Sequence, residues 1–130
     1  MVEKVLVWLL RVNGFLASLA IVAVVMPTAW IDAGARASGL GPFPDTMLTQ
    51  YLVRSVSLIY ALLGALTLYL SSDVRRYRDL IVFVGGMTMV LGVGLTVLDF
   101  SLGLPAAWSW GEGPPTVLVG AAFVWLARRL

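Results

Sequence analysis

Four long apolar runs, separated by short polar segments, dominate this 130-residue sequence. The runs cover about residues 5–26, 48–70, 80–99 and 114–130. A helix needs about 20 apolar residues to cross the hydrocarbon core of a bilayer. The composition agrees, since 60% of the residues are hydrophobic and 12% are charged, against roughly 45–50% and about 25% in soluble domains. The sequence therefore predicts an all-α protein with a single domain, a four-helix transmembrane bundle.

The long polar segment after the first run contains the pattern of one short helix. Thr28 is suited to cap its N-terminus, the pattern continues to Ala37, and Gly39 is suited to close it. Asp32 and Arg36 are separated by the spacing of a helical ion pair. We expect a short interfacial helix in this first outer loop, with the ion pair turned toward water.

The second run has boundary signals on both sides. Either Asp45 or Thr46 caps its N-terminus. After its end, residues 71–79 form a tight, charged turn beside the membrane. This turn contains three arginines: Arg75, Arg76 and Arg78. They would attract anionic lipid headgroups, at about 1 kcal/mol per basic residue, or they serve only to orient the chain.

The last run is short for a membrane span. Residues 100–115 are predicted to be a connection in which Trp108 and Trp110 anchor the chain at the interface. The proline pair at 114–115 is suited to a helix start, where no backbone N–H is needed. From there to the C-terminus a helix covers only about 24 Å. Either this helix begins earlier, with a proline kink, or the bilayer thins locally.

The basic residues predict on which side each end of the chain lies. In a chain that crosses four times, seven of the nine lie on or nearest one side: Lys4, Arg11, Arg75, Arg76, Arg78, Arg128 and Arg129. Only Arg36 and Arg54 lie on the other side. Because basic residues concentrate on the cytoplasmic side, we expect an up-down-up-down topology with both termini in the cytoplasm.

Small and polar residues recur at helical spacing in three of the runs. The stripes are Gln50, Arg54, Ser57, Ala61 and Gly64; Gly85, Thr88, Gly92, Thr96 and Asp99; and Gly113, Thr116, Gly120, Val124 and Ala127. Such residues let membrane helices approach one another closely. We therefore expect the three stripes to face a common axis.

Arg54 is a charge within a predicted span, and such a charge is costly unless it is paired. By the predicted topology, Asp99 and Glu112 lie in the same outer half. We expect a cluster in which Arg54 is held by one or both acids, with its hydrogen bonding completed by Gln50, Tyr51 and Tyr60. The cluster either fixes the register of the helices or forms the polar end of a ligand site or ion path.

A second polar site lies in the inner half of the first run, where Arg11 and Asn13 interrupt the apolar residues. Arg11 is close enough to the cytoplasmic side for its guanidinium to reach the headgroups along the surface of the helix.

The residue types that are missing narrow the chemistry. The sequence has no Cys and no His, which removes thiol chemistry, thiolate and imidazole metal ligands and the most common general base. We expect no metal and no cofactor, and enzymatic activity is disfavoured because a carboxylate pair alone supports few reactions. The net charge of only +2, with the basic residues beside apolar runs, argues against a nucleic-acid partner.

Three stretches carry a resemblance to a known class of proteins: residues 51–60 (YLVRSVSLIY), residues 72–77 (SDVRRY) and residues 103–114 (GLPAAWSWGEGP). They resemble small four-helix bacterial integral membrane proteins without assigned function, and the likeness covers nearly the whole chain. The resemblance implies the bacterial cytoplasmic (inner) membrane and brings no activity with it.

Three functions fit these observations. The first is a non-catalytic membrane protein, either an accessory subunit of a larger membrane complex or a homo-oligomer. The second is a binder of a lipid or small amphiphile whose polar end meets the cluster of Arg54, Asp99 and Glu112. The third is an ion or proton conductor that uses the same cluster. In each case the protein is embedded in the lipid bilayer and contacts its lipids.

Overall fold

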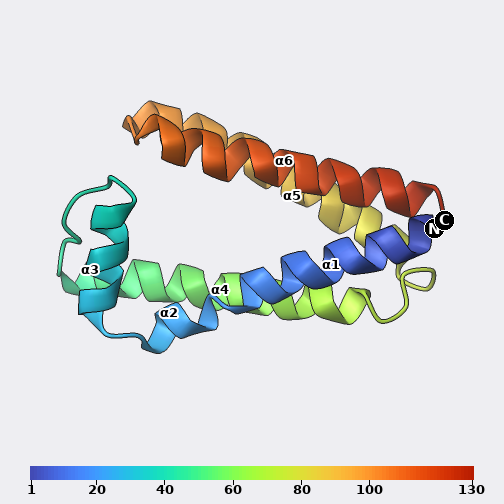
Figure 1. Cartoon of the computed structure of the whole chain (residues 1–130), viewed down its shortest axis with the longest axis horizontal. Helices are drawn as coiled ribbons and strands as arrows, with labels where there is room; N and C mark the ends of the chain where they lie inside the picture. Colours follow the sequence, from blue (N-terminus) through green and yellow to red (C-terminus); the bar gives the residue numbers. More distant parts are fainter. The chain divides into compact units, whose positions relative to one another are not determined.

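The computed structural model describes all 130 residues and contains helices but no strands (Figure 1). The helices are α1 (Val2–Ser18), α2 (Ile21–Val25), α3 (Thr28–Ala37), α4 (Met47–Leu70), α5 (Arg78–Leu102) and α6 (Ala106–Arg128). Three helical segments are long and apolar enough to cross a membrane: Val2–Val25, which combines α1 and α2, Met47–Leu70 and Arg78–Leu102. Helix α6 is not among them, because its first half contains Gly, Ser, Glu and two prolines.

The chain divides into two compact units. The first, which we call the hairpin unit, contains residues 1–10 and 70–130; the second, the α3 unit, contains residues 11–69. Each unit is described below by itself.

The hydrophobic core of the hairpin unit gathers the ends of four helices. Its buried members are Leu6, Leu10, Leu70, Val74, Ile81, Phe123, Leu126 and Ala127. They come from the start of α1, the end of α4, the following turn, the start of α5 and the end of α6. The N- and C-termini accordingly lie beside each other at this end of the unit (Figure 1).

Helices α5 and α6 pack side by side through glycines (Figure 1). A Cβ atom added to Gly120 would lie 2.5 Å from the carbonyl oxygen of Gly85, and one added to Gly92 would lie 2.6 Å from a Val117 methyl group. Both distances are too short for a real Cβ, so the two backbones touch only because these residues lack side chains. The predicted stripes on these two helices therefore do face each other.

In the α3 unit the small residues of α4 face α1. A Cβ atom on Gly64 would lie 2.5 Å from the backbone nitrogen of Ser18 and 2.7 Å from the carbonyl oxygen of Gly14. The predicted stripe of α4 is thus a packing face, and α1 covers it at Gly64. Gly14 and Ser18 form the matching small-residue face of α1, one turn apart. An axis shared by all three stripes stays a prediction.

Helix α3 has the predicted bounds. It ends in a left-handed glycine, Gly39 (φ 81°), with the Gly39 N–H donating to the Arg36 carbonyl and the Leu40 N–H to the Ala35 carbonyl. This is the Schellman arrangement that terminates many helices. The N-cap residue is Pro27 rather than Thr28, which is the first residue of the helix.

The start of α4 decides between the two predicted caps. The Thr46 hydroxyl oxygen accepts a hydrogen bond from the Thr49 backbone N–H at 3.1 Å, so Thr46 is the N-cap.

The predicted connection over residues 100–115 is mostly helical. Helix α5 continues to Leu102 and ends at Gly103 (φ 72°), and α6 begins at Ala106, after Pro105. Pro105 occupies the N-cap, so it makes the helix start that the sequence analysis assigned to the proline pair at 114–115, which lies inside α6. Of the two predicted alternatives for the last run, the earlier helix start is the one observed.

Candidate functional site

The guanidinium of Arg54 caps the end of α2. Its Nη1 donates hydrogen bonds to the carbonyl oxygens of Val24 at 2.8 Å, Met26 at 3.0 Å and Ala23 at 3.3 Å. The last carbonyls of a helix have no partner within the helix, and they form its partially negative end. A positive charge at this position therefore satisfies the free acceptors and the helix dipole together.

Gln50 connects this cap to the rest of the α3 unit. Its Oε1 accepts a hydrogen bond from Arg54 Nε at 3.0 Å, and its Nε2 donates to Thr28 Oγ1 at 2.7 Å and to Asp45 Oδ1 at 2.9 Å. One amide side chain thus links Arg54 to the start of α3 and to the segment before α4. Thr28 and Asp45, which this network joins to Gln50, were predicted only as helix caps.

Asp99 and Glu112 lie in the hairpin unit, on α5 and α6. The Asp99 side chain is 2% exposed, and its Oδ2 atom has no hydrogen-bond partner. The Glu112 carboxyl group lies close to the Asp99 carboxyl group, and Trp108 is one turn before Glu112 on α6. Ser109, one turn before Gly113 on the same helix, is fully buried and its hydroxyl is also without a partner.

The side of α6 next to this pair borders an open pocket. The pocket is lined by Ala107, Trp108, Gly111 and Glu112. The Glu112 carboxyl group on α6 therefore lies between the buried Asp99 and this pocket.

The predicted cluster combines residues of both units. Arg54 belongs to the α3 unit, and Asp99 and Glu112 belong to the hairpin unit. Their pairing stays a prediction. Tyr51 and Tyr60, expected to complete the cluster, have exposed side chains on α4.

The second predicted polar site also stays a prediction. Arg11 is exposed on α1 and Asn13 is partly exposed. An exposed arginine on an apolar helix has the freedom to extend its guanidinium to the headgroups.

The three arginines of the turn after α4 each contact protein groups of the hairpin unit. Arg75 Nε forms an ion pair with Glu3 Oε2 at 2.9 Å, and the Arg76 guanidinium lies over the Tyr77 ring at 5.5 Å. Arg78 donates to the carbonyl oxygens of Ala127 at 2.9 Å and Arg128 at 3.2 Å. Arg78 therefore caps the end of α6 as Arg54 caps the end of α2. The binding of anionic lipid by Arg75, Arg76 and Arg78 stays a prediction.

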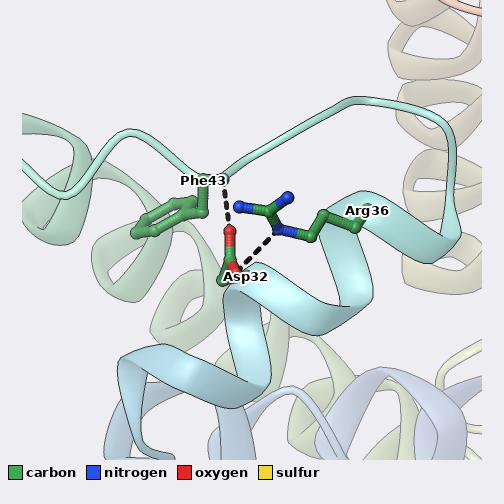
Figure 2. Close-up of polar contacts among 3 residues, drawn as sticks. All are labelled: Asp32, Arg36 and Phe43. Carbon is green, nitrogen blue, oxygen red and sulfur yellow. Dashed lines mark hydrogen bonds and ion pairs between the residues drawn. The ribbon is translucent and has the colours of Figure 1, made fainter.

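An aspartate holds the loop between α3 and α4 against α3 (Figure 2). Asp32 accepts hydrogen bonds from Arg36 Nε at 2.9 Å, which is the predicted ion pair, and from the Phe43 backbone N–H at 2.7 Å. The Phe43 N–H, and after it the Arg36 guanidinium, lowers the pKa of Asp32 because both donors favour the charged carboxylate. The contact with Phe43 was not predicted, since nothing in the sequence pairs a backbone N–H with a carboxylate eleven residues earlier.

No family model, curated protein or solved structure matches this chain in the comparisons with known proteins. The structure also contains no group of three or more Asp or Glu side chains placed to hold a metal ion. The functional proposal therefore depends on the geometry alone.

Proposed function

We propose that this chain is a four-helix protein of the bacterial cytoplasmic membrane with an up-down-up-down topology and both termini in the cytoplasm. Three helical segments have the length and hydropathy of spans, and α6 supplies the fourth crossing. The shared core of the hairpin unit supports this topology, because it joins the start of α1, the end of α4, the start of α5 and the end of α6. The seven basic residues assigned to this side support its cytoplasmic orientation.

Within that membrane we propose a non-catalytic function exerted through lateral association, as a homo-oligomer or as an accessory subunit. The network around Arg54 carries this proposal. Its Nη1 atom joins α4 to the end of α2 through backbone carbonyls, and its Nε atom bonds Gln50 on α4 itself. A charge used in this way supports a structural role for Arg54, which is partly buried, rather than a role in catalysis.

The outer face of α5 supports association in particular. Phe83, Val90 and Val97 are each more than 60% exposed on this face, opposite the glycines that contact α6. Gly86 and Gly94 lie between them and have open space where a Cβ would be. Small residues between large apolar ones make a surface that another helix can approach closely in a bilayer.

Co-purification from mild detergent tests this proposal. Two copies of the chain with different tags are co-expressed, one tag is captured, and the mass of the eluted complex is measured. We expect the second tag, or a larger membrane protein in fixed ratio, to elute with the first. Substitution of Gly94 by Leu should reduce this co-elution, while the control Gly34→Leu, in the exposed helix α3 with equally open space, should leave it unchanged.

A chain that elutes alone as a monomer, in detergent and in nanodiscs, would contradict lateral association. A monomer that retains a stoichiometric lipid or small amphiphile would support the binder function instead.

A further inference from the structure

Two acids stand alone in the hairpin formed by α5 and α6. Between Leu80 and Ala127, Asp99 and Glu112 are the only charged residues. The folding of the hairpin brings them together, with the Glu112 carboxyl group in reach of the Asp99 carboxyl group. Two carboxylates in contact repel each other, so such a pair requires a positive charge or a shared proton.

The surroundings of the pair strengthen this requirement. Asp99 is 2% exposed and Ser109 is fully buried, so water reaches neither side chain freely. Asp99 Oδ2 and Ser109 Oγ both lack a hydrogen-bond partner. Ser109 lies one turn before Gly113, which packs on Thr96, and Asp99 lies one turn after Thr96, so both oxygens belong to the same level of the α5–α6 interface. Buried polar oxygens normally have a partner, and two at one level indicate a ligand.

Within the hairpin unit, no basic residue lies beside these two acids. The basic residues of this unit lie at its other end, before Leu80 or after Ala127. In the α3 unit, Arg54 Nε and Nη1 are engaged by Gln50 and by carbonyl groups of α2. If the remaining Nη2 of Arg54 did reach the pair, one positive charge would face two negative charges, and one carboxylate would still be unbalanced.

We propose that the Asp99–Glu112 pair is a binding site for one monovalent cation, either a proton or a small metal ion such as sodium. Asp99 Oδ2 and Ser109 Oγ supply the buried oxygens of the site. Glu112 supplies the oxygen next to the open pocket, through which the cation enters. Trp108 lines this pocket beside Glu112. The proposal goes beyond lateral association and does not depend on it.

Infrared difference spectroscopy of the whole protein in nanodiscs tests for the proton. Selective ¹³C labelling of aspartate or glutamate carboxyl carbons assigns the bands. If the site holds a proton, a protonated carboxyl band is present at neutral pH. The band disappears in Asp99→Asn or Glu112→Gln, and it persists in the control Asp79→Asn, an exposed acid at the opposite end of α5. Absence of any protonated carboxyl band from the wild type excludes the proton even if a variant fails to fold.

A second measurement tests for the metal ion. Thermal unfolding is followed in sodium chloride and in choline chloride at the same ionic strength. If the site holds a metal ion, only carboxylate bands are present, and sodium raises the Tm of the wild type and of Asp79→Asn but not that of Asp99→Asn.

Two results overturn the proposal. One is a wild-type protein with no protonated carboxyl band and no difference between sodium and choline. The other is a protonated band or a sodium effect that persists unchanged in the double variant Asp99→Asn, Glu112→Gln.

Discussion

Arg54 Nη1 donates a 2.8 Å hydrogen bond to the carbonyl oxygen of Val24, a residue 30 positions earlier in the chain. The bond connects the middle of one apolar helix to the end of another. The bond pairs a charged guanidinium with a backbone carbonyl that has no partner within its own helix. Either group would be costly in an apolar environment if it were left unpaired. We therefore expect the loss of the Arg54 side chain to reduce the stability of the α3 unit more than the loss of any other side chain in it.

Substitution of Arg54 by Leu should lower the free energy of unfolding by about 2–4 kcal/mol, because hydrogen bonds to charged groups contribute about 1.5–3 kcal/mol each and several are lost together. Thermal unfolding in mild detergent measures the change. The control Arg36→Leu removes an exposed ion pair, and such pairs are worth at most about 1 kcal/mol. An Arg54→Leu protein as stable as the wild type would show that the cap contributes nothing.

A double-mutant cycle separates the cap from the predicted counter-charge. If Arg54 acts mainly on the α2 carbonyls, neutralising the acids with Asp99→Asn and Glu112→Gln should leave the cost of Arg54→Leu unchanged. If Arg54 pairs with the acids, the cost should fall in that background, and the predicted cluster would then be supported. The measurement is again thermal unfolding, with all proteins in the same detergent.

Adjacent glycines on α5 should respond oppositely to the same substitution. In Gly85→Ala the added Cβ would lie 2.8 Å from the Gly120 carbonyl oxygen, so the helices must separate, at a cost of about 1–3 kcal/mol. In Gly86→Ala it meets nothing within 4 Å, and a helical alanine is favoured over glycine by up to about 1 kcal/mol. Unfolding of both variants measures the difference. Equal effects at the two positions would contradict the close α5–α6 contact.

The outer loop should loosen in acid because of Asp32. The pKa of Asp32 is lower in the folded protein, so the carboxylate stabilises the loop above the ordinary aspartate pKa of about 3.9. This contribution is lost as the pH falls from there through the lower folded pKa. The protection of the Phe43 amide, which is its exchange rate compared with the intrinsic rate at the same pH, should therefore fall at acidic pH in the wild type. In Asp32→Asn, exchange should already be fast at neutral pH, and an unchanged rate there would contradict the role of this hydrogen bond.

Local signals predicted much of this fold. Residues 28–37 form the predicted helix, and α4 begins within one residue of the predicted start at 48. These features depend on apolar periodicity, caps and glycines, all of which act over a few residues. The proline pair at 114–115 misled the prediction because Pro105, nine residues earlier, provides an equally good helix start.

The partners of the charged residues were much harder to predict. Spacing predicted that Arg54 faces the neighbouring helices, but its main acceptors are backbone carbonyls, which every residue has and no sequence pattern marks. The same holds for Arg78 and the carbonyls at the end of α6. A stripe of small residues likewise shows which face is packed and not which helix covers it, as Gly64 and Gly14 illustrate.

Single cysteines can test the proposed topology, because the chain has none of its own. Ser38 follows α3 in the outer loop, and Ser72 lies in the turn after α4. A span between them should place Ser38→Cys outside and Ser72→Cys in the cytoplasm. In intact cells, a membrane-impermeant maleimide should label only Ser38→Cys; after lysis it should label both. Labelling of Ser72→Cys in intact cells would reverse the orientation, and identical behaviour of both variants would exclude an odd number of crossings between them.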